Sequence, residues 1–292
     1  MYLFRLLHKF ISWVQIHLAV KHAINNRIGV LFFSPTSTTK KICNAIASGM
    51  GAEDPLILDM THPGTRSEII DNADTVLDGI DHLIAGAPVY CGKLPLQAIE
   101  CLKALKGQVK KATAVAVYGN RDYGIAPHNM AEILSQNGFT VMGAGLFIGQ
   151  HSYSDVVPVA IGRPDESDIE KAREFGVQIL QASRPLNIED IPIQWDKHSK
   201  SKEYTALKPT YRGKICVKCG RCAEVCPTGI LSSETGKHIN RYVKKNCIGC
   251  MACVRNCNSR ARLAKANPIV RIMMKSVLGQ ASRERKEPVV VM

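Results

Sequence analysis

Eight cysteines lie within 42 residues of a 292-residue chain, and their spacing repeats. Cys216, Cys219, Cys222 and Cys226 are followed by Pro227 in the pattern C-x2-C-x2-C-x3-C-P. The same spacing recurs 31 residues later at Cys247, Cys250, Cys253 and Cys257, with Asn258 in place of the proline. So many thiols in so short a segment could form disulfides, bind zinc or bind an iron-sulfur cluster, and the spacing discriminates among these.

The three-residue steps favour iron-sulfur clusters. Structural zinc sites usually take two close pairs of ligands from separate turns. Three thiolates at successive three-residue steps instead suit a loop that curls around one corner of a cubane, while the fourth iron takes a thiolate from elsewhere. Two copies of the run therefore imply two 4Fe-4S clusters.

The fourth cysteine of each run is expected to bind the other cluster, as in two-cluster proteins with this spacing. One cluster is then assigned to Cys216, Cys219, Cys222 and Cys257. The second is assigned to Cys247, Cys250, Cys253 and Cys226. The pattern resembles the bacterial-type dicluster ferredoxins over about residues 212–262. Asn258 stands where that family usually has proline, and this departure removes no ligand.

Near-continuous apolar runs alternate with helical patterns between residues 27 and 183. Such runs predict strands that are buried on both faces, here at 27–33, 56–60, 81–89, 112–118 and 141–148. Helices are expected over 39–48, 67–73, 94–105, 127–137 and 165–182. Five strand-helix units predict an α/β fold with a doubly wound, five-stranded parallel sheet. In such sheets ligands bind in the loops beyond the carboxyl ends of the strands.

Three of these loops carry hydroxyl or aromatic groups. After the first strand, Ser34, Thr36, Ser37, Thr38 and Thr39 precede a helix whose first N–H groups lack partners. This arrangement suits a phosphate, although the same residues would also serve as a helix cap without any ligand. The loops after the third and fourth strands contain Val89, Tyr90 and Gly92, and Gly119, Asn120 and Tyr123.

The strand order and these loops together resemble the flavodoxin family over about residues 27–182. That resemblance implies FMN, with its phosphate held by the five hydroxyl residues and its ring between Tyr90 and Tyr123. It further implies that backbone at Val89, Gly92, Gly119 and Asn120 contacts the ring edge. The phosphate loop departs from the family at Ser37, where glycine is common, and at Pro35, which has no N–H. A flavodoxin fold without its cofactor is the alternative.

The order of the two parts resembles the flavodoxin-ferredoxin fusion proteins of anaerobic bacteria and archaea over about residues 27–262. The stretches 118–121 and 151–165 contribute to this resemblance. It implies an intracellular electron-transfer protein, and thiolate-bound clusters suit a reducing cytoplasm. The alternative is a flavin-dependent reductase acting on a small organic substrate. No catalytic residue is assigned, and Cys91, His128 and His151 are expected to be ordinary loop or packing residues.

The net charge of +13 lies entirely in the C-terminal part. Residues 184–292 carry 22 Lys and Arg against 8 Asp and Glu, whereas residues 1–183 carry 16 against 17. Two oxidised clusters, each of charge about −2, leave this part positive, so an acidic redox partner is expected to dock there. The candidate docking residues are Lys218, Arg221, Lys244, Lys245 and Arg255. Nucleic acid is not expected, because the basic residues are not interleaved with aromatic ones.

Five segments are therefore expected: an amphipathic N-terminal helix at 1–26, a flavodoxin-like domain at 27–183, a linker at 184–211, a ferredoxin domain at 212–265 and a basic tail at 266–292. The first segment would dock on the domain surface or make peripheral contact with a membrane. In the tail, Ile269, Ile272, Met273 and Leu278 predict an apolar helical patch that covers a cluster.

Overall fold

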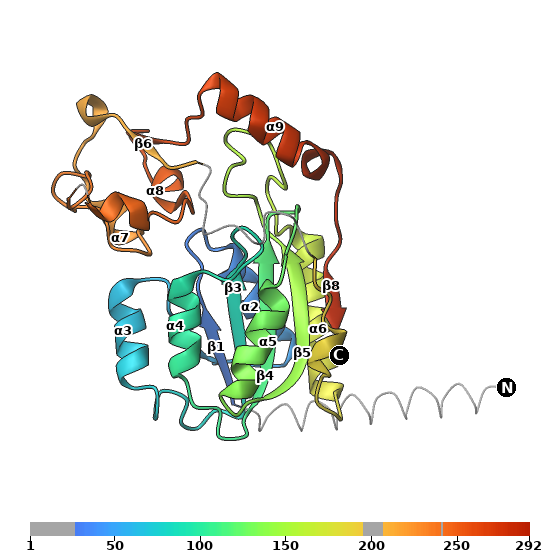
Figure 1. Cartoon of the computed structure of the whole chain (residues 1–292). Helices are drawn as coiled ribbons and strands as arrows, with labels where there is room; N and C mark the ends of the chain where they lie inside the picture. The colour runs from blue at the N-terminus through green and yellow to red at the C-terminus, as the bar shows by residue number, and fades with distance from the viewer. Residues whose placement is uncertain (1–26, 195–206, 241) are drawn as a thin grey trace.

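A computed structural model describes residues 27–194, 207–240 and 242–292 (Figure 1). The amphipathic helix expected over residues 1–26 lies outside the described residues. None of the helices in the described ranges is long and apolar enough to cross a membrane.

Five parallel strands form the centre of the molecule in the order β2-β1-β3-β4-β5 (Figure 1). They are β1 (Ile28–Phe32), β2 (Leu56–Asp59), β3 (His82–Pro88), β4 (Lys111–Tyr118) and β5 (Thr140–Ile148). The chain order reverses between β1 and β3, which is the switch point of a flavodoxin-like doubly wound sheet. The predicted fold class is thus confirmed, and each predicted strand differs from the observed one by at most one residue at either end.

Helices cover both faces of the sheet. They are α2 (Thr38–Gly49), α3 (Pro63–Asp71), α4 (Leu96–Ala104), α5 (Ala126–Gln136) and α6 (Glu166–Gln181). One apolar core lies beneath α2 and α6 and includes Ile46 and Phe175. A second core lies beneath α3, α4 and α5 and includes Leu102 and Met130. Cys43 and Cys101 are fully buried in these cores.

A small second region follows the sheet and lies beyond the carboxyl ends of its strands (Figure 1). It contains two one-turn helices, α7 (Arg221–Glu224) and α8 (Ala252–Arg255), and a two-stranded antiparallel ribbon of β6 (Thr210–Tyr211) and β7 (Arg262–Leu263). Short 3-10 turns are η3 (Gly213–Ile215) and η4 (Tyr242–Asn246), with η1 (Ile188–Asp190) before them. Ile248 packs against the core of the sheet domain, and Arg66 donates a hydrogen bond to the Pro227 carbonyl oxygen at 3.3 Å. These contacts join the two regions.

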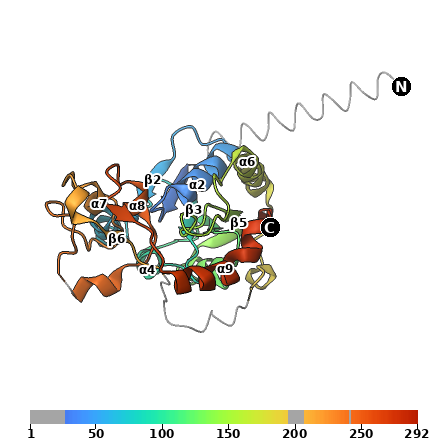
Figure 2. The same ribbon diagram turned by 90° about the horizontal axis from the view of Figure 1, so that it is seen from above.

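The C-terminal segment returns to the sheet domain. Helix α9 (Pro268–Arg283) crosses beyond the strand ends (Figures 1 and 2), and β8 (Val289–Val291) then pairs antiparallel with β5 (Figure 1). This sixth strand was not predicted. The buried residues of α9 are Met274, Leu278 and Ala281, which pack on the loop after β5. The predicted apolar patch is therefore wrong apart from Leu278.

The error in α9 is one of register. Ile269 and Ile272 are 78% and 69% exposed, and Met273 is also exposed. The stripe that packs runs through positions 274, 278 and 281. At about 100° per residue it lies roughly 150° around the helix axis from the three exposed residues. The face of α9 that packs on the loop after β5 is therefore not the face that carries Ile269, Ile272 and Met273.

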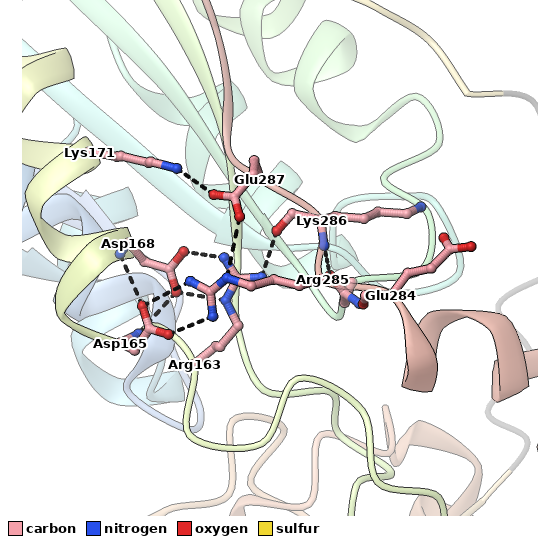
Figure 3. Close-up of polar contacts among 9 residues, drawn as sticks. Arg163, Asp165, Asp168, Lys171, Glu284, Arg285, Lys286 and Glu287 are labelled. Atoms are coloured by element: carbon pink, nitrogen blue, oxygen red, sulfur yellow. Dashed lines mark hydrogen bonds and ion pairs between the residues drawn. The ribbon is translucent and has the colours of Figure 1, made fainter.

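Ionic contacts fasten the segment between α9 and β8 to the sheet domain (Figure 3). Arg163 and Asp168 form a buried ion pair, and Arg163 Nη1 also donates to the Lys286 carbonyl oxygen at 2.7 Å. Asp165 caps α6 by accepting the Asp168 backbone N–H. Exposed pairs add to this connection: Arg285 with Asp165, and Lys171 with Glu287. Residues 284–287 are thus held at several points, and we call them the C-terminal strap.

Candidate cofactor sites

Two cavities divide the eight clustered cysteines into crossed sets. One cavity is lined by Cys226, Cys247, Cys250 and Cys253, which we call the inner set. The other is lined by Cys216, Cys219, Cys222 and Cys257, the outer set. Each cavity thus takes its fourth cysteine from the other run. This grouping is the one that crossed ligation requires, while the ligation itself stays a prediction.

The two sets differ in their access to water. In the inner set, Cys226 and Cys250 are each 8% exposed, and burial raises the pKa of the Cys253 thiol to about 12. In the outer set, Cys219 is exposed. A hydrogen bond from Tyr211 is the largest cause that lowers the pKa of Cys216. Cys247 and Cys253 are partly buried, as are the other three cysteines of the outer set, so the outer set is the more exposed of the two.

The two cysteine runs share backbone conformation as well as spacing. Three pairs of positions, each 31 residues apart, have positive φ: Lys218 and Gly249, Gly220 and Met251, and Gly229 and Arg260. At the first of these positions, the Lys218 N–H donates to Cys216 Sγ at 3.4 Å. Backbone in such conformations turns N–H groups toward sulfur, a contact that tunes clusters of this kind. The turn after the second run is retained even though Asn258 replaces proline.

The inner set lies beside the loop that follows β3. Tyr90 in this loop packs against the sheet core, and its backbone pairs with Lys93 through two hydrogen bonds of 2.9 and 3.1 Å. Burial raises the pKa of Tyr90 well above its usual value, and the charge of Cys250 acts in the same direction. Since electrostatic effects of this kind require proximity, the loop predicted to hold the flavin ring is also the neighbour of the inner set.

The loop after β1 has the form of an anion site. Ser37, at the N-terminus of α2, has φ 64°, so serine adopts the left-handed conformation at a position where glycine is common in the family. Its N–H donates to the Ser34 carbonyl oxygen at 3.1 Å, and the Lys40 N–H donates to Ser34 Oγ at 3.0 Å. Ser34 N–H in turn donates to Thr61 Oγ1 at 2.8 Å. These bonds hold the loop in a tight turn without glycine.

Several polar groups in this loop have no partner in the part of the chain that the structure describes. Thr39 is fully buried, yet its Oγ1 has no hydrogen-bond partner. The N–H groups of Thr36 and Thr38 likewise have no acceptor among the described residues. An unsatisfied buried hydroxyl beside free N–H groups at a helix N-terminus is what a phosphate would complete. The residues at this end therefore fit the phosphate of FMN.

The two tyrosines expected to flank a flavin ring have different surroundings. Tyr123 is 7% exposed and packs edge-on against Tyr118, with ring centroids 5.5 Å apart. Tyr90 instead packs partly buried against the sheet core, close enough to Cys250 for the charge of that thiol to affect it. The loops that carry them do meet, because the Ile125 N–H donates to the Gly92 carbonyl oxygen at 2.9 Å. The contacts at Val89 and Gly92 with a ring edge stay predictions.

Asn120 has a role that the sequence did not reveal. Its side-chain amide donates to the carbonyl oxygens of Ala281 and Glu284, at 2.8 and 2.6 Å, and accepts the Lys286 N–H at 3.1 Å. The residue is 2% exposed. Asn120 therefore ties the loop after β4 to α9 and the C-terminal strap.

Gly119 precedes Asn120 in the loop after β4, and the His151 side chain packs against it. A Cβ atom at Gly119 would clash with the His151 imidazole ring. Burial is the largest cause that lowers the pKa of His151, to about 4. The ring is therefore neutral near pH 7. Gly119 is needed here for space, whatever contact its backbone makes with a ligand.

Comparison with known proteins gives one family match and a set of similar folds. The model of a 4Fe-4S dicluster domain matches residues 215–262. Similar solved structures are a flavodoxin from the domain Archaea, at 20% identity and TM-score 0.39, covering 53% of this chain and 96% of that one. Oxidised flavodoxin 2 from Bacillus cereus has 16% identity and TM-score 0.38, covering 53% and 98%. The rubredoxin oxygen:oxidoreductase of the anaerobe Desulfovibrio gigas has 16% identity and TM-score 0.41, covering 56% and 38%.

A search of curated proteins gave no match. The sheet domain is flavodoxin-like by its own strand order, 2-1-3-4-5, and not by these similarities. The chain thus combines a flavodoxin-like domain with a 4Fe-4S dicluster domain, as the sequence resemblance predicted. The dicluster domain implies two 4Fe-4S clusters and electron transfer.

Proposed function

We propose that the protein passes electrons between a redox partner, two 4Fe-4S clusters and an FMN. The observation that supports this most is the order of the sites. The outer cysteine set is the more exposed one, and the inner set is the more buried one and adjoins the Tyr90 loop at the switch point of the sheet. This order supports a route from the protein surface through the two clusters to the predicted flavin site.

The chemistry along this route would come from the cofactors. When bound, a cluster carries one electron at a time and a flavin accepts one or two, so the pair can convert between one-electron and two-electron carriers. The residues of the chain supply position and shielding. Ile248 between two inner-set cysteines packs on the sheet core, which fixes the inner set relative to the Tyr90 loop.

Three side chains near the inner set and the flavin loop, those of Tyr90, His151 and Tyr153, are neutral near pH 7, and Arg255 is a charged group beside them. Burial raises the pKa of the Tyr153 phenol, and Tyr153 also lies close enough to Cys247 and Cys250 for their charge to affect it. Tyr90 is held protonated in the same way, and burial keeps the His151 imidazole uncharged. An electron crossing this junction therefore meets no fixed ionised side chain from these three residues.

We propose an acidic redox protein as the partner, docking at the outer set. Val217 next to Cys216 is 70% exposed, and Ile215 is 44% exposed. Exposed Lys218 and Arg221 lie beside them, so the surface combines an apolar centre with positive charge. Arg255 does not belong to this surface, since it is partly buried and donates to the His151 carbonyl oxygen at 3.0 Å.

The proposed setting is the cytoplasm of an anaerobe. A reducing compartment keeps the eight clustered thiols available as ligands. The resemblance to fusion proteins of anaerobes supports the same setting.

Anaerobic purification of the full chain, with iron, sulfide and flavin counted, tests the cofactors first. Stopped-flow reduction by an acidic ferredoxin then tests the route. We expect cluster reduction to precede flavin reduction, at a rate that falls as salt rises, because charge attraction is screened over about 10 Å at 0.1 M salt. A chain that holds both clusters but whose flavin is never reduced through them would refute the proposal.

Charge reversal provides the matched control for the docking surface. Lys218→Glu with Arg221→Glu should slow the reaction and flatten its salt dependence. Lys106→Glu, at an exposed position remote from the outer set along the chain, should leave both unchanged. A rate indifferent to ionic strength in the unaltered protein would contradict the acidic partner.

A further inference from the structure

Arg262 is a buried cation that lines both cysteine cavities. It is 3% exposed, and it contributes to the wall of the inner cavity and to that of the outer cavity. It begins β7, five residues after Cys257. Its guanidinium group therefore lies between the two predicted cluster sites.

The contacts of Arg262 leave its charge and one donor unsatisfied. Nη2 donates to the Gly236 carbonyl oxygen, and the guanidinium carbon lies 4.8 Å from the centre of the Tyr211 ring. Nε is buried and has no partner. Among the described residues no carboxylate forms an ion pair with it. A buried charge without a counter-ion is costly, so a negative group is expected at one or both cavities.

The internal repeat shows that this arginine is not required by the fold of the loop. The position 31 residues earlier, in the equivalent turn after Cys226, is Leu231. Leu231 lines only the inner cavity, and it is buried like its counterpart. An apolar residue therefore suffices at this place in the first run, and the second run carries a cation instead.

The charge of Arg262 reaches cysteines of both sets. Arg262 lines one cavity together with Cys222 of the outer set and the other together with Cys253 of the inner set, so its positive charge lies close to ligands of both predicted clusters. A cluster held by four thiolates has a charge of about −2 when oxidised and about −3 after it accepts one electron. A fixed cation between two such clusters favours the more negative state of each.

We propose that Arg262 sets the reduction potentials of both clusters, donating its Nε–H to a sulfur of one cluster and placing its charge between the two. In each reduction one electron passes from a donor to a cluster, no bond is made or broken, and Arg262 stays protonated. The inference rests on the two clusters of the proposed function but not on its flavin.

The test is an EPR-monitored redox titration of the full chain with both clusters present, using dithionite as the reductant. Arg262→Gln should lower the midpoint potential of both clusters. At a fixed potential the ratio of reduced to oxidised cluster should fall at least about tenfold, or about 59 mV for one electron. Lys265→Gln removes an equal charge from an exposed neighbouring position and should shift neither potential by as much.

Unchanged potentials in Arg262→Gln, with iron and sulfide for both clusters, would overturn the inference. So would a shift no larger than that of Lys265→Gln. If Arg262→Gln does not hold both clusters, pulsed EPR of the unaltered protein with ¹⁵N-labelled arginine decides. A nitrogen coupling at a reduced cluster supports the hydrogen bond, and its absence refutes it. A chain with both clusters but no FMN would refute the proposed function while leaving these measurements intact.

Discussion

Replacing Thr39 with valine should weaken FMN binding without destabilising the flavin-free protein. Valine keeps the shape of threonine and removes only the hydroxyl. Thr39 is fully buried, and its Oγ1 has no partner in the described part of the chain. The hydroxyl thus stabilises nothing in the protein alone, and its contribution would come only from a bound phosphate.

The two effects can be estimated separately. A hydrogen bond to a charged group contributes about 1.5–3 kcal/mol, so losing one from the phosphate should weaken FMN binding about 10-fold to 150-fold. In the flavin-free protein, an unsatisfied buried hydroxyl is unfavourable by about 1–3 kcal/mol. Its removal should therefore leave the free energy of unfolding unchanged or raise it. An ordinary helix cap would behave in the opposite way, since its loss costs about 1 kcal/mol of stability.

The assay is a fluorescence titration of the flavin-free protein with FMN, beside urea unfolding of the same preparation. Riboflavin, which lacks the phosphate, should bind the variant and the unaltered protein alike. Thr65→Val serves as the matched control, because Thr65 is exposed and its Oγ1 donates to the His62 carbonyl oxygen at 3.3 Å. It should not change the affinity for FMN.

An unchanged affinity for FMN in Thr39→Val would refute the reasoning about the phosphate loop. A loss of about 1 kcal/mol or more in the stability of the flavin-free protein would also count against it. The hydroxyl would then be a structural group, and the loop after β1 a cap without a ligand.

Three further predictions concern the clusters and the packing of the sheet domain. Cys226→Ser should remove the EPR signal of the inner cluster and leave the signal of the outer cluster, to which the other three cysteines of the first run are assigned. Loss of the outer cluster's signal instead would contradict crossed ligation. Burial lowers the pKa of His82 to about 3. Between about pH 6.5 and pH 3 the unfolded chain therefore binds a proton that the folded chain does not, and the free energy of unfolding should fall as the pH drops through this range. His82→Gln should reduce that slope by up to one proton in urea unfolding at several pH values, and an unchanged slope would argue against a neutral buried imidazole. Arg163→Met should destabilise the fold by about 3–5 kcal/mol, because Asp168 would be left buried without its partner. Thermal unfolding with a loss below about 1 kcal/mol would show that the pair contributes little.

Much of the fold follows from local sequence patterns. Strands buried on both faces need continuous apolar runs, and 27–33 and 112–118 are of this kind, so their positions were predictable to within a residue. The grouping of cysteines into two cavities was predicted from their spacing together with the crossed ligation that two-cluster proteins with this spacing use.

The remaining features depend on contacts between distant parts of the chain. Val289–Val291 is a short run at the chain end, and nothing local shows that it pairs with β5. The partners of Asn120 lie more than 160 residues away in a segment that was expected to be a tail. In α9 the most apolar stripe was taken as the buried one, although burial was decided by the loop against which the helix packs.

The pairing of β8 with β5 has a consequence for how the protein is made. About 140 residues separate the end of β5 from β8, and the whole cluster-binding region lies between them. At about 5–20 residues per second, a ribosome needs roughly 7–30 s to synthesise that stretch. During this time the outer edge of β5 has no neighbouring strand, and an unpaired edge can associate with other chains. The sheet is therefore completed only when β8 has been made, and deletion of residues 289–292 should increase aggregation during synthesis.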